Sequence, residues 1–416
     1  MSFSRWFLSK IKSRWSPSKP PLDYDQWSRQ ALIDRLRLLD NHQSPSPPPL
    51  PPTKRPFTIT DYPRHRIALK VAYQGWNYLG FAAQKDTTQT VEHQLFEALD
   101  HCKLISPGVD NDYSRCGRTD KGVSGLGQVI ALNVRRYNTP IMPYVETLNR
   151  VLPQDIRIVA WSPVAPTFNA RFDCVSRTYR YMFLRDTLDL DAMRLAASHL
   201  IGIHDFRNFC KLDPSKQTNH TRHILSIDIV PCSSKHQYEV VIKGKAFLWH
   251  QVRYIMSILF LVGQGHEPAS IVPELLNINH VSARPDYPLA SALPLLLHHC
   301  EFSPGALNWQ QSQARPYRLH QHWHDLGYEH DVRAWHYHAC LQDQDQDQQQ
   351  DQQQASVQPA STVTLGAGRY IRTTKYRPLL TRARAESEQL KRQKYHAKLA
   401  RKNKTTSLVY TPSSSQ

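Results

Sequence analysis

Cysteine is scarce in this chain, with 7 among 416 residues, and no two of them form a Cys-x-x-Cys pair. An odd number of cysteines without a disulfide framework is typical of reduced thiols inside a cell. Two groups combine histidine with cysteine but match no zinc-binding spacing; they are His298-His299-Cys300 and His336-x-His338-x-Cys340. We therefore expect no metal site.

Long apolar runs are also missing. No stretch approaches the roughly 20 residues that a membrane-spanning helix needs. The longest candidate, Tyr254 to Val262, is better explained as part of a buried helix. No G-x-G-x-x-G turn follows the first expected strand, which argues against a doubly wound dinucleotide-binding sheet. The sequence thus indicates neither a membrane protein nor a small-molecule cofactor.

Acidic residues are rare at both ends of the chain. Residues 1–22 hold five Lys or Arg and no acid, and residues 369–404 hold thirteen against Glu386 and Glu388. These ends carry most of the net charge of +17. Such a balance favours a polyanionic partner, nucleic acid ahead of membrane. Alternatively, the basic ends keep the protein soluble or carry a localisation signal.

The N-terminal segment leaves the compartment open. Residues 1–22 are basic and Ser-rich, which fits either an organelle-targeting segment or a disordered nucleic-acid arm. We expect the protein in the nucleus, the cytoplasm or both, with mitochondrial targeting as the alternative.

Hydrophobic periodicity predicts an α+β fold. Ile67, Leu69, Val71 and Tyr73 alternate as in a strand, and Thr90 can cap a helix that follows it. Further strands are expected at 128–134, 156–161, 177–184, 224–230 and 238–247. Further helices are expected at 140–152, 192–201, 249–262, 269–276 and 386–402. Strands and helices mixed in each half, with hairpins, predict two mixed α/β lobes with a largely antiparallel sheet.

These elements suggest a division into eight parts. They are a basic arm (1–22), a short helix (23–43), a Pro-rich linker (44–60), an N-terminal catalytic lobe (61–163), a C-terminal catalytic lobe (164–305), an extension (306–340), an Asp/Gln-rich disordered linker (341–367) and a basic tail (368–416).

The most informative segment is the loop at residues 116–128, CGRTDKGVSGLGQ. It presents the carboxylate of Asp120 two residues after Arg118, among four glycines, and an apolar run follows at once. Glycines permit sharp backbone bends, and a bent loop braced by a strand can present a catalytic group. A Gly-rich turn with a structural Arg118–Asp120 pair is the alternative.

This loop resembles that of the tRNA pseudouridine synthases of the TruA type, through the motif GRTDKGV at 117–123. Three further segments are similar to family motifs, in the same order; they are FNARFDCVSRTYRYMF (168–183), GIHDFRNF (202–209) and FLWHQVR (247–253). Four other segments resemble the eukaryotic branch that acts on tRNA positions 38 and 39; they lie at 68–84, 148–161, 263–278 and 283–302.

The resemblance implies a pseudouridine synthase fold with a central basic cleft, and it assigns roles to five residues. Asp120 corresponds to the catalytic carboxylate, and Tyr179 to the active-site tyrosine. Arg253 corresponds to the cation that partners the carboxylate of Asp120. Arg118, Tyr179 and Leu295 correspond to substrate-binding positions, with Arg118 entering the space that the flipped base leaves. From the residues alone, Arg253 could lie in solvent, and Tyr179 and Leu295 could be packed in the core.

The resemblance also implies partners and chemistry. We expect a homodimer that binds tRNA and isomerises uridine in the anticodon stem-loop without a cofactor. Two alternatives stay open: a catalytically silent tRNA-binding or folding protein on the same fold, and a synthase of the same family with another RNA target.

Overall fold

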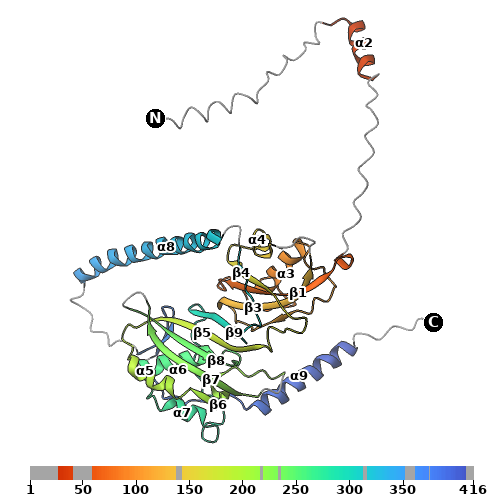
Figure 1. Ribbon diagram of the computed structural model, residues 1–416. Helices are drawn as coiled ribbons and strands as arrows, with labels where there is room; N and C mark the ends of the chain where they lie inside the picture. Colours follow the sequence, from red (N-terminus) through yellow and green to blue (C-terminus); the bar gives the residue numbers. More distant parts are fainter. Residues whose placement is uncertain are drawn as a thin grey trace. The chain divides into compact units, whose positions relative to one another are not determined.

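The computed structural model describes residues 27–40, 59–136, 143–215, 219–232, 236–312, 316–351, 361–373 and 375–408. Contacts divide the chain into two units, Met1–Thr58 and Ile59–Gln416. In the first unit the described element is α2 (Arg29–Asp40), which is the helix expected within 23–43 (Figure 1). The basic arm and most of the Pro-rich linker lie outside the described residues.

The second unit is built on one mixed sheet of nine strands among its described residues, in the order β4-β1-β3-β9-β5-β8-β7-β6, with β2 paired to β3. Its strands are β1 (Arg64–Tyr73), β2 (Ser114–Arg115), β3 (Ser124–Arg135), β4 (Ile156–Pro163), β5 (Cys174–Leu184), β6 (Gly202–Asp205), β7 (Thr221–Pro231), β8 (Gln237–Gly244) and β9 (Leu295–Phe302). Only β3 and β9 pair in parallel. The two halves are therefore antiparallel and join at that pair, which confirms the predicted fold class.

Helices cover the two halves of this sheet separately. The helices and 3-10 turns are η2 (Ile59–Asp61), α3 (Val91–His101), α4 (Tyr144–Asn149), α5 (Leu190–Ser198), η3 (Arg207–Phe209), α6 (Gln251–Gly263), α7 (Ile271–Leu276), α8 (Pro316–Asp351), η4 (Leu379–Thr381) and α9 (Glu388–Leu408). Thr90 caps α3 as expected, since its hydroxyl accepts from the His93 amide. The helix predicted at 140–152 is shorter, because α4 begins only after Pro143.

Side-chain alternation gives the first half of the sheet two buried faces. Ile67 and Leu69 point into a core shared with α3 and α4. Their neighbour Ala68 points into a smaller cluster on the opposite face, which includes three cysteines. Because successive strand residues point to opposite faces, both sides of β1 are packed.

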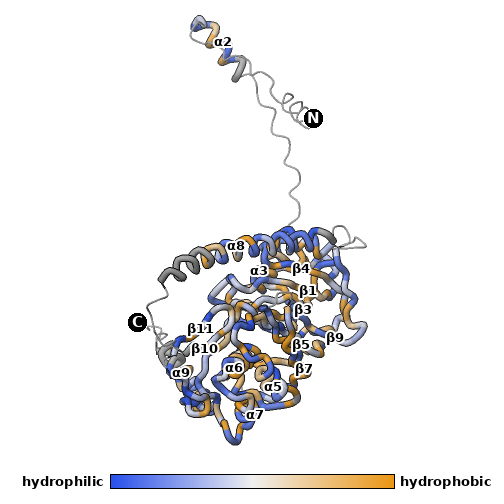
Figure 2. The backbone as a smooth tube through the Cα atoms, turned by 90° about the vertical axis from the view of Figure 1, so that its left-hand side faces the viewer, coloured by the Kyte–Doolittle hydropathy of each residue, from blue (hydrophilic) through white to orange (hydrophobic). Residues whose placement is uncertain are grey.

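The second half of the sheet packs against α5, α6 and α7. Helix α6 is buried on nearly all sides and is largely orange, the hydrophobic end of the scale, in Figure 2. It carries the apolar run 254–262, so that run is a core helix, as the sequence predicts. Of the helices within the described residues, none combines the length and the apolar character that a membrane crossing requires.

The C-terminal third differs from the sequence expectation. Helix α8 continues to Asp351, and the hairpin of β10 (Ser361–Gly366) and β11 (Arg369–Thr373) begins at Ser361. The prediction of a disordered linker over 341–367 is therefore wrong at both of its ends. A polar, low-complexity composition did not exclude helical backbone in 341–351, because helix propensity of Gln residues is favourable.

The predicted tail at 368–416 is in part a folded element. Leu379 is fully buried, and Glu267 accepts hydrogen bonds from the Tyr376 hydroxyl and the Leu379 amide, both at 2.6 Å. Beyond these contacts comes the largely exposed helix α9, which agrees with the helix expected at 386–402. Residues 361–385 thus complete the core of the second half.

Candidate active site

The loop that carries Asp120 lies beside the parallel junction of the sheet. It connects β2 to β3, and β3 begins with Ser124, which pairs with Leu296 of β9. A turn closes between the Asp120 carbonyl and the Val123 amide at 3.1 Å. The loop also binds the segment after β1, since the Thr119 carbonyl accepts from the Phe81 amide at 3.2 Å.

Two buried side chains hold this loop from beneath. The Gln128 amide group donates to the Gly117 carbonyl at 2.8 Å and accepts from the Gly117 amide at 3.3 Å, so it brackets that residue on both sides. The hydroxyls of Tyr73 and Thr119 are 2.8 Å apart. Because Gln128 is fully buried, the chain just before Asp120 is fixed by satisfied polar contacts.

Glycines are required here by close approach. A Cβ atom on Gly125 would lie 2.6 Å from the Tyr73 ring, and one on Gly75 would lie 1.9 Å from the Val123 carbonyl oxygen. Gly122 has a φ of +80°, which residues with a side chain rarely adopt. The Gly-rich composition that marked the loop in the sequence therefore reflects a tightly packed turn.

Asp120 is a mostly buried carboxylate with polar and cationic neighbours. Burial raises its pKa to about 6, while Arg253, Lys211 and a hydrogen bond from Trp249 act in the opposite direction. His250 Nε2 lies 3.7 Å from Asp120 Oδ1. A pKa near 6 still leaves the group ionised at neutral pH, so the site holds a partly desolvated anion.

Arg253 is close to Asp120 but is bonded to another group. Among the described residues, the basic side chain within 4 Å of the Asp120 carboxylate is His250 and not Arg253. The Arg253 Nε instead donates to the Ala290 carbonyl at 2.7 Å. The guanidinium therefore binds the backbone of Ala290 rather than the Asp120 carboxylate. What remains is electrostatic attraction.

Tyr179 and Leu295 come from neighbouring strands of the second half. Tyr179 of β5 is half-buried and packs edge-on against Phe247, with the ring centroids 5.1 Å apart. Burial raises its pKa well above the ordinary value, so the phenol is neutral. Leu295 begins β9 and is 4% exposed within the second-half core. Its functional role stays a prediction, because its position equally serves packing.

Arg118 is exposed at the top of the loop. Partial burial, followed by the charges of Arg115 and Arg171, lowers the pKa of its guanidinium. The adjacent Phe172 ring is 78% exposed, and the Arg171 guanidinium lies 5.5 Å from its centroid. Arg118 and Asp120 are thus separate groups: one is a surface cation and the other a buried anion. The Arg118–Asp120 ion pair considered from the sequence is absent among the described contacts.

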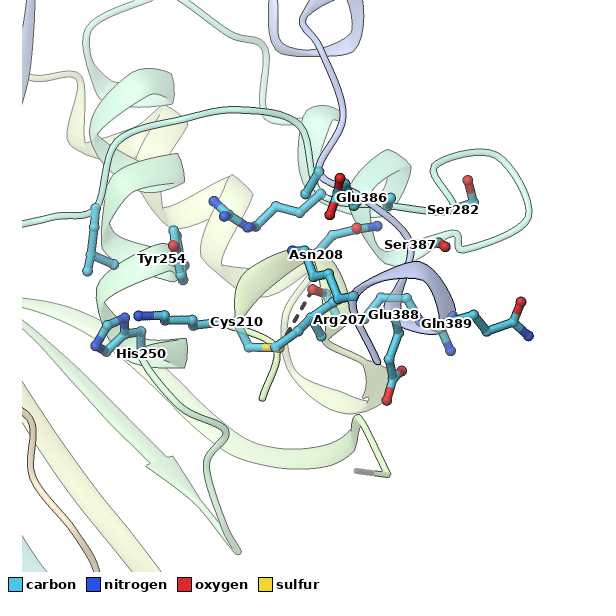
Figure 3. A pocket seen from close by; sticks show the side chains of 17 residues that line it. Arg207, Asn208, Cys210, His250, Tyr254, Ser282, Glu386, Ser387, Glu388 and Gln389 are labelled. Atoms are coloured by element: carbon cyan, nitrogen blue, oxygen red, sulfur yellow. Dashed lines mark hydrogen bonds between the residues drawn. The ribbon is translucent and has the colours of Figure 1, made fainter. Parts of the chain in front are cut away.

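A cavity of about 630 Å³ adjoins Asp120 through His250 and Lys211. In Figure 3, His250 and Tyr254 lie at one end of it and Glu386 to Gln389 of the C-terminal segment at the other. The Arg284 guanidinium stacks over the Tyr254 ring at 4.3 Å, and Lys211 Nζ lies 4.3 Å over the Trp249 ring. Neither cation belongs to an ion pair within the described part of the chain.

Sequence reasoning missed the residues around Asp120 other than Arg253. Trp249 and His250 lie inside the motif 247–253, so the signal was present but unassigned. His250 adopts a left-handed backbone with a φ of 63° at the start of α6. Burial and the nearby cations lower its pKa to about 4, which makes the ring neutral. Lys211 and Arg284 lie in no quoted catalytic motif, and only the fold brings them here.

One cluster could hold a metal ion. The Sγ atoms of Cys116, Cys174 and Cys300 lie within 4.8 Å of one another, and all three residues are buried. The histidines next to Cys300 do not take part in this cluster. Sequence spacing had suggested no such grouping, because the three cysteines belong to three separate segments.

Comparison with known proteins defines the class. A sequence model described as tRNA pseudouridine synthase matches residues 196–303. The tRNA pseudouridine synthase A of Methanothrix thermoacetophila is 38% identical over 228 residues, covering 54% of this chain and 79% of its own length. The class is therefore that of the pseudouridine synthases.

Eukaryotic relatives define the family within this class. The tRNA pseudouridine(38/39) synthase of Saccharomyces cerevisiae is 42% identical over 340 residues, 72% of this chain and 76% of its own length. The human protein of the same description is 42% identical over 325 residues, 70% of this chain. The chain belongs to the tRNA pseudouridine synthase family. It spans 66% of the human and 58% of the mouse relative.

Similar solved structures contribute little to the assignment of the family. The Cbf5-Nop10-Gar1 complex has a TM-score of 0.25 and 14% identity, covering 47% of this chain and 45% of that chain. A likeness of this size is too weak to support an argument.

Proposed function

We propose that the protein isomerises uridine to pseudouridine in the anticodon stem-loop of tRNA, at positions 38 and 39. The observation that carries the proposal is the ionised, mostly buried carboxylate of Asp120 at the junction of the two half-sheets. The family membership and the names of the yeast and human relatives support the same substrate.

Asp120 is the catalytic carboxylate of this proposal. Pseudouridine formation breaks the N1–C1′ bond, turns the base and rejoins it through C5. An ionised carboxylate can attack C1′ or assist the departure of the base, and either role needs the charged form. Arg253 and Lys211 favour that form by charge. The neutral phenol of Tyr179 can stack on the uracil and exchange the C5 proton.

The target base must leave its stack to reach Asp120. Arg118, which is exposed on the same loop, would fill the vacated space. Lys211 and Arg284 line the adjoining cavity without ion-pair partners in the described residues, and stacking on aromatic rings holds them in place. Both can bind backbone phosphates next to the flipped nucleotide. Leu295 would contribute an apolar wall near the base.

A homodimer completes the proposal, with one tRNA contacting both subunits. Light scattering of the full chain with and without tRNA tests it. A mass of two chains without tRNA, and of two chains plus one tRNA with it, is the expected result; a stable monomer that still forms pseudouridine contradicts the proposal.

The deciding experiment is pseudouridine mapping on tRNAs from cells that lack this protein. Loss of the modification at positions 38 and 39, restored by the wild-type chain, is expected. The variant Asp120→Asn should bind tRNA with a similar affinity and form no pseudouridine, a loss of at least about 10⁴-fold for a nucleophile. Retained activity in Asp120→Asn would exclude the assigned role.

The same experiment separates the alternatives. A catalytically silent tRNA-binding protein would leave the modification at both positions intact in the mutant cells. A synthase with another target would leave positions 38 and 39 modified and remove pseudouridine elsewhere. If the Asp120→Asn variant restored the modification to the wild-type level, the protein would act without this carboxylate, which would favour a role in tRNA folding.

A further inference from the structure

Three thiols from three distant segments meet behind the catalytic loop. Cys116 follows β2, Cys174 begins β5 and Cys300 lies in β9. The residues are 3%, 7% and 5% exposed, and their Sγ atoms all lie within 4.8 Å of one another. Buried cysteines often pack as small apolar groups, but convergence of three from separate segments creates a set of three soft donors.

The distances suit a tetrahedral thiophilic ion. With Zn–S bonds of about 2.3 Å, sulfur atoms of one zinc site are about 3.8 Å apart. A contraction of about 1 Å, within the reach of side-chain rotation, brings the cluster to that spacing. Strand β5 shifts register against β9 between Cys174 and Ser176. The Cys174 thiol donates to the Ser176 carbonyl oxygen at 3.2 Å, so one oxygen lies beside this sulfur.

A cation beside the cluster balances its charge. The Arg177 guanidinium donates to the carbonyl oxygens of Cys116 at 3.0 Å and of Cys174 at 3.2 Å. Three thiolates with a divalent ion carry a charge of −1, which Arg177 neutralises. Because a buried net charge is costly, this favours Zn²⁺ over Cu⁺, which would leave one negative charge uncompensated. No histidine or carboxylate joins the cluster among the described residues.

We propose that Cys116, Cys174 and Cys300 form a structural zinc site. The ion would tie the base of the catalytic loop to β5 and β9, the strands that carry Tyr179 and Leu295. Cys116 precedes Asp120 by only three intervening residues, so the metal would fix the position of the loop. Zinc takes no part in bond making or breaking in this proposal.

The test measures metal content, which makes its outcome independent of pseudouridine formation. The full chain, purified under reducing conditions, is analysed for metals by mass spectrometry, and Zn²⁺ release is titrated with a thiol-modifying reagent. About one Zn²⁺ per chain is expected. In addition, Co²⁺ reconstitution of the wild type should give the intense near-ultraviolet thiolate charge-transfer band and the visible bands of a tetrahedral thiolate site.

Variants locate the ion. Cys300→Ser and Cys174→Ser should each lose most of the bound Zn²⁺ and the Co²⁺–thiolate band. The matched control is Cys210→Ser, since Cys210 is also buried, at 2% exposure, but lies outside the cluster. It should retain the metal. Should a cluster variant fail to fold, the wild-type measurements still decide the matter.

Three results would overturn the proposal. The first is a wild-type chain that takes up neither Zn²⁺ nor Co²⁺ at micromolar concentrations while its cysteines are reduced. The second is equal metal content in Cys300→Ser and Cys210→Ser. Uptake of Cu⁺ with exclusion of Zn²⁺ would also contradict the charge balance that Arg177 provides.

Discussion

At the scale of single residues, the site depends on how Asp120 is desolvated. Burial raises its pKa from the ordinary 3.8 to about 6, although two cations and the Trp249 indole favour the anion. Above about pH 6 the ionised Asp120 carboxylate therefore lowers the stability of the folded state. Catalytic groups often carry such a cost, because the environment that suits the transition state is not the most stable one.

Asp120→Asn should accordingly stabilise the fold at alkaline pH. Because the folded pKa is raised, the cost is present above about pH 6 and absent below pH 4, where the carboxyl is neutral in both states. A shift of about two pKa units corresponds to at most about 3 kcal/mol, and the 22% exposure of the side chain reduces it. Chemical denaturation at pH 8 and pH 4 measures the difference. An equal effect at the two pH values would contradict this account.

Gly75 is a second residue on which the loop depends. A methyl group there would lie 1.9 Å from the Val123 carbonyl oxygen, which is backbone and cannot rotate away. Gly75→Ala should displace the loop, lower the rate of pseudouridine formation at least tenfold and destabilise the chain by about 1–3 kcal/mol. The control is Gly327→Ala in α8, where a Cβ meets no atom within 4 Å. Wild-type rates in Gly75→Ala would refute the close approach.

At the scale of elements, the C-terminal segment is part of the second half-sheet's core. Tyr181 of β5 donates from its hydroxyl to the Ser291 carbonyl at 3.0 Å and lies near the Leu365 carbonyl at 3.3 Å. Val363 and Leu379 are buried in the same core. Composition suggested a basic tail, but Leu379 of that tail is part of the core of the second half-sheet.

Leu379→Ala tests this packing. Loss of a fully buried leucine should cost about 2–5 kcal/mol of unfolding free energy, from lost burial and the remaining cavity. Leu380→Ala is the matched control, since the neighbouring side chain is 38% exposed and should change stability by no more than about 0.5 kcal/mol. Denaturant titration of both variants gives the comparison. Similar losses at the two positions would argue against a folded C-terminal element.

At the scale of the whole molecule, chemistry and electrostatic attraction are separated along the chain. The loop at 116–123 and the cavity beside it carry the proposed chemistry, whereas α9 is polar and carries a run of basic residues. Positive charge that lies outside the reacting site can contribute affinity for a polyanion without contributing to the chemical step. The net charge of +17 thus bears on the affinity for tRNA rather than on the chemical step.

Deletion of 392–416 should therefore weaken tRNA binding and leave the single-turnover rate at saturating enzyme nearly unchanged. It removes the basic part of α9 but keeps Leu379 and Glu388, which lies 3.8 Å from His220. Each lost phosphate contact should reduce the slope of log affinity against log salt by about 0.7–0.9. Binding measured at several salt concentrations provides the slope. An unchanged slope would show that α9 is not an RNA contact.

Much of the site was predictable from the sequence, because its motifs are local. Asp120 and Arg118 share one loop, and the Gly-rich composition reports a turn whose backbone needs small residues. The strand of Tyr179 and the helix of Arg253 follow from periodicity. The helix cap at Thr90 follows from capping chemistry. For the strand, the helix and the cap, the determining contacts lie within a few residues along the chain.

Only the tertiary structure decided what surrounds these groups. The pairing of β3 with β9 joins the two half-sheets, and no local pattern encodes a pairing across some 170 residues. That pairing brings Cys116 to Cys300, and the packing of the C-terminal segment gives Arg284 and Lys211 a shared cavity. Arg253 bonds the Ala290 carbonyl because a backbone acceptor lies there. The sequence by itself determined which chemical groups are present and on which elements; long-range packing determined which of them meet and how far each is removed from water.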